Sequence, residues 1–277
     1  MLWKNQRESD NVQDVRGRSV RGGTLSIGSV LLVLLVSYIT GQNPLTLLSM
    51  LSGSSSSVSS PEAYQSSPEQ EESKRFLAAV LGSTEDVWGD LFQRMGKQYE
   101  RPHLVLFTDQ VESACGLSSA ATGPFYCPGD NRLYVDMGFL GQLQRQLGAE
   151  GDFAAAYVVA HEVGHHVQTI LGIQSAAGSL RAAGEGSHQV KFELQADCFA
   201  GVWGYYAAQQ GLLEPGDAEE GLNAARAVGD DRIQQMSGRS VSPDSFTHGS
   251  STERSASFQR GFSSGSIKEC DLFGNFS

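Results

Sequence analysis

The chain has 277 residues, which is long enough for one folded domain of about 200 residues together with some appendages. Its net charge of −11 is unevenly distributed, because residues 1–21 carry +2 and the rest of the chain carries −13. Such an acidic body argues against a polyanionic partner. Nucleic acid is therefore excluded as an expected ligand.

An uncharged stretch follows the first residues. Residues 22–61 contain no charged side chain, and 22–42 alone are long enough to cross a bilayer core of about 30 Å as a single transmembrane helix. The positive-inside rule then predicts that 1–21 form a cytoplasmic stub at the inner or plasma membrane, with the domain that follows the helix periplasmic or extracellular. A cleaved signal peptide is the alternative. It is less favoured because no small-x-small cleavage site follows the apolar core.

Residues 43–72 are rich in Ser and contain three prolines. Such a segment cannot bury enough apolar surface to fold alone, so we expect a flexible linker. The folded domain is expected to cover 73–277. At its start, apolar residues at three- and four-residue steps predict an amphipathic helix over 76–95, broken near Gly82.

The fold class predicted for the domain is α+β, mostly helical with a small sheet and preceded by the transmembrane helix. Short strands are expected at 103–107 and 132–136, and the Gly-, Ser- and Pro-rich region 116–131 between them has room for a hairpin. A flexible lid or crossing loop is expected at 172–186. Further helices are expected at 139–147, at 215–228 before a break at 229–232, and after a capping box of Ser250 and Glu253.

A long helix is expected at 153–171, where most residues favour helix. Asp152 is placed to cap its start, and Gly172 lies just past its end. This otherwise apolar helix carries a His-Glu-x-x-His motif. Imidazoles in such surroundings need polar partners, and a metal ion supplies one.

The spacing of the motif is that of a zinc site. His161 and His165 lie one helical turn apart on one face, with Cβ atoms roughly 6 Å apart, so both rings can bind one Zn²⁺. Glu162 lies about 100° further round the helix, which places its carboxylate near a water at the metal without making it a ligand. We therefore predict Glu162 as the catalytic general base.

A catalytic zinc requires a third protein ligand and an open fourth position. Glu193 is the best candidate, because it begins a second amphipathic helix that runs to about Tyr206. Asp197 follows four residues later on the same face and is expected to accept a hydrogen bond from the far nitrogen of a zinc-bound histidine.

The remaining histidines are weaker candidates. His166 points about 100° away from His165 and cannot share its metal geometry, and His188 competes poorly with Glu193 as a ligand. His248 stands in a Gly- and Ser-flanked turn. We predict it as the donor that stabilises the oxyanion of the tetrahedral intermediate, with Tyr134 and Arg254 as rivals.

The four cysteines fit an exported domain in which thiols can oxidise. They allow three connectivities. One pairing would close the loop between Cys115 and Cys127 and tie Cys198 to Cys270, while Cys198 could instead remain a buried free thiol.

These motifs resemble those of the gluzincins, zinc peptidases that take their third ligand from a glutamate. The wider pattern is similar to the bacterial family described as putative neutral zinc metallopeptidases, through the segments at 123–128, 161–166, 193–198 and 248–251 behind an N-terminal hydrophobic stretch. The resemblance implies a zincin-like domain with His161, His165 and Glu193 as ligands and Glu162 as the catalytic residue. By analogy with zincins, a sheet edge that binds peptide is expected within 116–131.

The sequence therefore predicts a membrane-anchored zinc metallopeptidase that acts on a peptide or protein substrate. One alternative is a catalytically silent zinc protein that scaffolds partners in the cell envelope. Another is a zinc hydrolase of non-peptide amides or esters, since an activated water attacks either bond.

Overall fold

The computed structural model describes residues 1–17, 65–139, 141, 143, 151–173 and 183–276. Its main sheet has four strands in the order β1-β2-β6-β5. The first three run parallel, and β5 pairs antiparallel with β6 at one edge. The strands are β1 (Val12–Asp14), β2 (His103–Phe107), β6 (Arg132–Asp136) and β5 (Phe125–Cys127), and a separate hairpin consists of β3 (Gln110–Ser113) and β4 (Gly116–Ser119).

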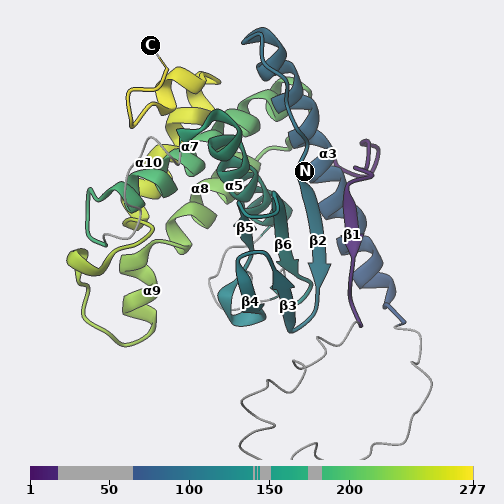
Figure 1. Cartoon of the computed structure of the whole chain (residues 1–277), viewed down its shortest axis with the longest axis horizontal. Helices are drawn as coiled ribbons and strands as arrows, with labels where there is room; N and C mark the ends of the chain where they lie inside the picture. The colour runs from purple at the N-terminus through teal and green to yellow at the C-terminus, as the bar shows by residue number, and fades with distance from the viewer. Residues whose placement is uncertain (18–64, 140, 142, 144–150, 174–182, 277) are drawn as a thin grey trace, which may run out of the picture. The chain divides into compact units, whose positions relative to one another are not determined.

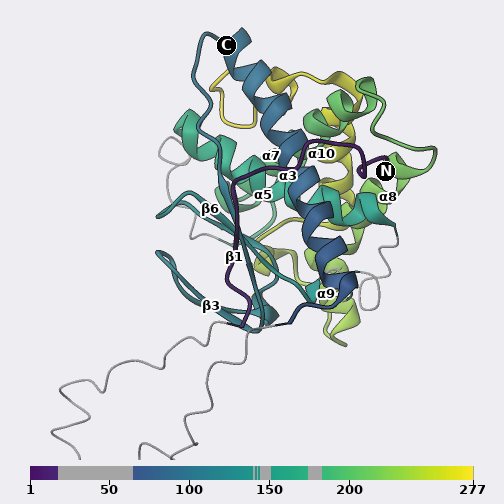
Figure 2. The same cartoon turned by 90° about the vertical axis from the view of Figure 1, so that its right-hand side faces the viewer.

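A body of helices packs beside this sheet (Figure 1). Helix α7 lies between α5 and α10, α8 packs on both of these outer helices, and α3 packs on α5 and α7. Figure 2 shows α3 running along the outside of the body, near β1. The helices are α3 (Pro68–Arg94), α5 (Asp152–Leu171), α7 (His188–Gln209), α8 (Asp217–Ala227), α9 (Asp230–Met236) and α10 (Ser251–Ser264), with 3₁₀ turns at η1 (Ala120–Thr122), η2 (Pro243–Ser245) and η3 (Ile267–Cys270).

The core is apolar and rich in aromatic side chains. Trp88 of α3 meets Phe199 of α7 edge to face, and Trp203 of α7 stacks on Phe153 of α5. The indole nitrogen of Trp203 donates a hydrogen bond to Ser83, so this ring is buried without an unsatisfied donor. These contacts fix the three longest helices against one another.

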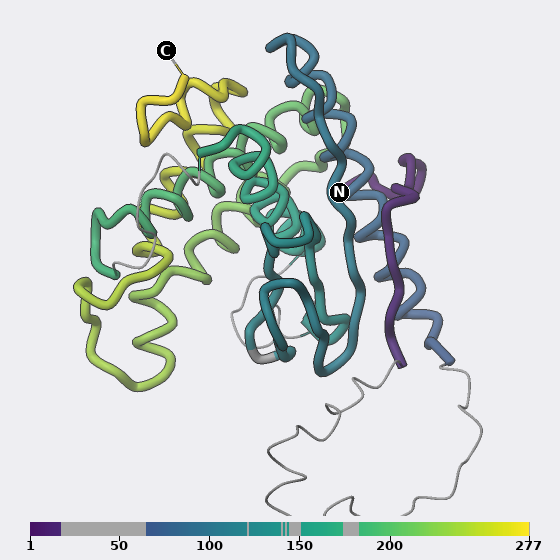
Figure 3. The backbone as a smooth tube through the Cα atoms, in the orientation of Figure 1, coloured from purple at the N-terminus to yellow at the C-terminus, as the bar shows by residue number. Residues whose placement is uncertain are grey.

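The first sixteen residues, which were expected to belong to a cytoplasmic stub at 1–21, form one compact unit with residues 66–277. Strand β1 pairs with β2, and the side chains of Met1 and Trp3 are buried in the core. Figure 3 follows this purple segment along the rest of the domain. Strand β1 has only three residues and finds its partner about ninety positions later, so no local pattern reveals it.

The α-amino group of Met1 is held by three carboxylates. It lies 2.7 Å from Asp152, 2.8 Å from Glu214 and 3.3 Å from Asp217. Burial lowers the pKa of this amine, but the hydrogen bonds and charges of the carboxylates outweigh burial and raise the pKa to about 10. The prediction that Asp152 caps α5 is therefore wrong. The helix begins at Asp152 after Gly151, and the carboxylate of Asp152 binds the α-amino group of Met1.

Helix α3 differs from its prediction in where it begins and in its continuity at Gly82. It begins at Pro68 behind a capping box of Ser67 and Gln70, so the folded domain resumes before residue 73. It is continuous through Gly82, where a break was expected. A Cβ at this position would lie 2.4 Å from the carbonyl oxygen of Arg7, so the glycine serves the close approach of the N-terminal segment.

Several other predictions can be compared directly. Strands β2 and β6 have the predicted bounds, and the capping box of Ser250 and Glu253 opens α10. The expected hairpin begins earlier, at Gln110, and α9 occupies most of the predicted break at 229–232. Both cysteine pairs are disulfides, Cys115–Cys127 and Cys198–Cys270.

Within the described residues, no helix is both long and apolar enough to cross a membrane. The predicted transmembrane helix at 22–42 lies outside the described residues, as does most of the linker at 43–72. Most of the predicted helix at 139–147 and of the predicted lid at 172–186 lies outside them too. Residues on either side of 18–64 contact each other, because Arg16 forms an ion pair of 2.8 Å with Glu71 in the first turn of α3.

Candidate metal centre

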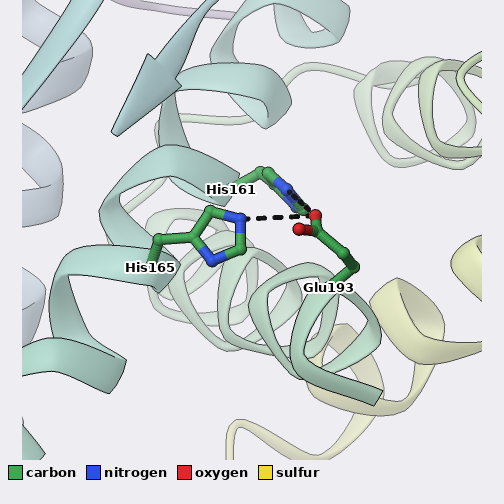
Figure 4. Close-up of side chains that lie close together, drawn as sticks. All are labelled: His161, His165 and Glu193. Carbon is green, nitrogen blue, oxygen red and sulfur yellow. Dashed lines mark hydrogen bonds and ion pairs between the residues drawn. The ribbon is translucent and has the colours of Figure 1, made fainter. Parts of the chain in front are cut away.

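The three predicted ligands converge at one point between α5 and α7 (Figure 4). The Nε2 atoms of His161 and His165 lie 3.2 Å and 3.3 Å from one carboxylate oxygen of Glu193. One ligand atom from each residue lies within 4.8 Å of the others. All three side chains are largely buried, so the donors are preorganised by packing.

The close crossing of α5 and α7 produces this convergence. Gly164 lies within the His-Glu-x-x-His motif and faces Ala196 of α7. A Cβ at Gly164 would lie 2.8 Å from the carbonyl oxygen of Ala196, so a larger residue would push the helices apart. Glu193 lies about one turn before Ala196, which brings its carboxylate opposite the two histidines.

The partners of the imidazole rings suit a zinc site. The Nδ1 atom of His161 lies 2.7 Å from Asp197, as predicted, and the Nδ1 atom of His165 lies 2.8 Å from the amide oxygen of Gln168. Both partner atoms accept hydrogen bonds, which places the ring proton on Nδ1 and leaves the lone pair of Nε2 facing the common point. Two such nitrogens and a carboxylate form a donor set that fits Zn²⁺ with an open fourth position.

Asp197 is the centre of a buried polar network. Its carboxylate accepts hydrogen bonds from Tyr157 at 2.5 Å and from Arg254 at 2.8 Å and 2.9 Å, in addition to its contact with His161. Burial raises the pKa of Asp197, but the charges of Arg254 and His161 outweigh it and lower the pKa to about 2. Asp197 is therefore a permanent carboxylate beside the histidine.

The sequence analysis did not predict two residues that support the histidines, Tyr157 and Gln168. Tyr157 lies four residues before His161, and Gln168 lies three residues after His165, so each shares a helical face with the ligand that it supports. That spacing was the available signal. Arg254 was considered only as an oxyanion donor, and its pairing with Asp197 depends on the docking of α10, which no local pattern encodes.

Glu162 lies at the wall of the cavity that contains the ligands. Its side chain is buried, and this burial raises the pKa of its carboxyl group above the ordinary value. A carboxylate with a raised pKa is a stronger base, which suits the role predicted for Glu162.

The structure separates the three candidates for the oxyanion donor. His248 lines the same cavity, with its side chain 49% exposed and its Nδ1 atom 3.2 Å from Asp230. Arg254 also lines the cavity, but its guanidinium is committed to Asp197 and to the carbonyl of Val228. The hydroxyl of Tyr134 binds Asp130 instead. His248 thus remains the best-placed candidate of the three, and its role stays a prediction.

Two further histidines, His166 and His188, lie apart from the cluster of ligands. His166 contacts the hydroxyl of Tyr126 and the carbonyl oxygen of Glu100, and burial lowers its pKa to about 4. This agrees with the expectation that it points away from the metal. His188 begins α7 one turn and a half before Glu193.

A buried pair of imidazoles and a glutamate ligand beside a second glutamate is the arrangement of HExxH zinc metallopeptidases. Over residues 1–273 the chain matches the family model described as "Putative neutral zinc metallopeptidase", and it belongs to that family.

Two relatives illustrate the breadth of this family. "Uncharacterized protein YpfJ" of Escherichia coli K12 is 45% identical over 286 residues, which cover 99% of each chain. "Uncharacterized protein Rv2575" of Mycobacterium tuberculosis H37Rv is 45% identical over 210 residues, which cover 71% of this chain and 69% of the relative. No solved structure matches the chain significantly.

Proposed function

We propose that the protein is a zinc-dependent metallopeptidase that hydrolyses peptide bonds. The observation that carries this proposal is the convergence of His161, His165 and Glu193 beside the buried carboxylate of Glu162, in one cavity of about 590 Å³. Zinc held by these three side chains would supply a Lewis acid that polarises the scissile carbonyl and makes water more acidic.

The protein side chains have distinct parts in this reaction. Glu162 takes a proton from the attacking water and delivers it to the nitrogen of the leaving amine. Asp197 fixes the ring of His161 and is itself fixed by Arg254. His248 donates a hydrogen bond to the oxyanion that forms when water attacks the carbonyl.

Replacing Glu162 by Gln tests the proposal. The variant keeps the size of the side chain but removes the base, so we expect one zinc ion to remain bound while peptide hydrolysis falls by at least about 100-fold. Zinc content by mass spectrometry and cleavage of a peptide library are the measurements. Glu112→Gln, at an exposed position of β3, is the matched control and should behave as the unmodified protein. Full activity in purified Glu162→Gln would refute the role of this residue.

The same measurements separate the alternative functions. A silent scaffold would be stabilised by zinc without cleaving any peptide. A hydrolase of other amides would cleave small amides and esters but not peptides, and this cleavage would again depend on Glu162.

We also propose that the catalytic domain works outside the cytoplasm, in association with a membrane through residues 22–42. Two disulfides within the domain support an oxidising compartment. The uncharged sequence of 22–61 supports the membrane. Labelling of an introduced thiol from outside the cell tests the compartment, and protection of every exposed domain position would contradict it.

A further inference from the structure

Two cavities adjoin the metal centre. The larger, of about 590 Å³, contains Glu162 and His248, and the smaller, of about 230 Å³, reaches Thr169 and Gln189. Both are lined by Tyr126, His165 and Glu193. The predicted zinc ligands therefore lie between the two cavities. A bound peptide substrate can extend into one cavity on each side of its scissile bond.

Strand β5 and the residue after it line both cavities. Phe125 faces the larger cavity, Pro128 directly after the strand faces the smaller one, and Tyr126 faces both. Among the described residues β5 pairs only with β6, so its other edge is free to accept an extended peptide. The hydroxyl of Tyr126 is fixed by Asn131 at 2.9 Å, which keeps this shared wall in place.

Among the described residues that line the two cavities, none is a free anchor for a chain terminus. An aminopeptidase needs a free carboxylate for the α-ammonium group, and the carboxylates among the described lining residues are Glu162 and Glu193, both at the metal centre. A carboxypeptidase needs a free cation for the α-carboxylate. Arg254 is already paired with Asp197, and His248 is bonded to Asp230.

The larger cavity favours apolar side chains. Away from the metal its walls are built from Phe139, Leu143, Val158, Val228 and Ile233. Burying an apolar side chain of a substrate against such a wall is favourable, because it removes apolar surface from water. The smaller cavity carries the polar groups of Thr169 and Gln189 instead.

We propose that the protein is an endopeptidase: it cleaves internal bonds of extended chains and prefers an apolar side chain in the larger cavity. This inference rests on the proposed function. In the reaction a C–O bond forms between water and the scissile carbonyl carbon, and the C–N bond breaks. One proton of the water passes through Glu162 to the new amine.

Peptides with blocked ends test the inference. The zinc-loaded full chain is given a library of decapeptides with free termini and the same library acetylated at the N-terminus and amidated at the C-terminus. An endopeptidase should cleave internal bonds in both, with kcat/KM values that agree within about threefold, whereas an enzyme that pairs with a terminus should lose on the order of 10⁴-fold on blocked peptides. Release of single residues from free ends only would overturn the inference and leave the proposed function intact. No metal-dependent cleavage of either library would overturn both.

The apolar wall is tested with a pair of variants on α9. Ile233 lines the larger cavity and is 42% exposed, while Met236 is 51% exposed and lies outside the cavity lining. We expect Ile233→Asp to lower kcat/KM about tenfold for blocked peptides with Leu or Phe at the preferred position, and to affect peptides with Ala there much less. Met236→Asp should change neither. Equal loss on both peptide types for Ile233→Asp would contradict the assigned preference.

Discussion

Asp197 illustrates how much of the metal centre depends on one side chain. Its two oxygens bind His161, Tyr157 and Arg254, so it joins α5, α7 and α10 at a fully buried point. A carboxylate in that position orients the imidazole of His161 and also compensates the buried positive charge of Arg254. Loss of either interaction therefore disturbs the donor geometry.

Replacing Asp197 by Asn should weaken zinc binding about 10–100-fold. One carboxylate oxygen accepts from His161 and the other from the Nε atom of Arg254, so an amide nitrogen at either place would turn a donor toward a donor. Competition with a zinc chelator measures the affinity. Asp244→Asn, at an exposed position of η2, is the control. Unchanged affinity in Asp197→Asn would remove this residue from the support of His161.

The ligand residues were predictable because one helix imposes their geometry. His161, Glu162 and His165 lie within five consecutive positions, so the helical period alone sets their directions. Glu193 was accessible because it opens an apolar helical pattern. Asp197 was accessible through the same period, because it lies one turn after Glu193 on the face that meets His161. The partners supplied by α10 were not predictable, because they depend on helix packing between distant segments.

At the scale of elements, local sequence predicts those helices and strands whose ends are set by neighbouring residues, and it fails where a distant segment sets them. Strands β2 and β6 are apolar runs bounded by turn residues, and their predicted bounds agree with the structure. The start of α7 was placed too late, because the side-chain cap at Ser187 precedes the apolar pattern. Gly82 was interpreted as a break because its partner, the backbone of Arg7, lies outside any local window.

Gly82 and Gly89 form a matched pair on α3 for testing that contact. A Cβ at Gly82 would collide with the backbone of Arg7, while a Cβ at Gly89 would meet nothing within 4 Å. We expect Gly82→Ala to lower the free energy of unfolding by about 1–3 kcal/mol. Gly89→Ala should raise it by about 0.5–1 kcal/mol through helix propensity. Urea unfolding measures both, and equal effects would show that the N-terminal segment does not pack on Gly82.

At the scale of the whole molecule, β1 constrains how the chain relates to a membrane. Residues 1–16 and 66–277 form one folded unit. A single crossing within 17–65 would place these two parts on opposite sides, which is incompatible with the pairing of β1 and β2. The pairing of β1 with β2 therefore argues against an arrangement with a cytoplasmic N-terminus and an external catalytic domain, and the location of these two parts stays a prediction.

Thiol labelling tests this arrangement. All four native cysteines are in disulfides, so a single introduced cysteine reports its own exposure. Asn5→Cys and Ser237→Cys place a thiol at exposed positions of the N-terminal segment and of the catalytic body. With a membrane-impermeant maleimide and spheroplasts, we expect both positions to be labelled to the same extent. Labelling of position 237 with protection of position 5 would show that β1 is not docked on β2 in the protein as the cell contains it.

The buried ammonium group of Met1 makes the very first atom of the chain part of the fold. Its positive charge satisfies carboxylates from two places in the chain, Asp152 at the start of α5 and Glu214 and Asp217 at the start of α8. The N-terminal segment is thus tied directly to the start of the helix that carries His161 and His165.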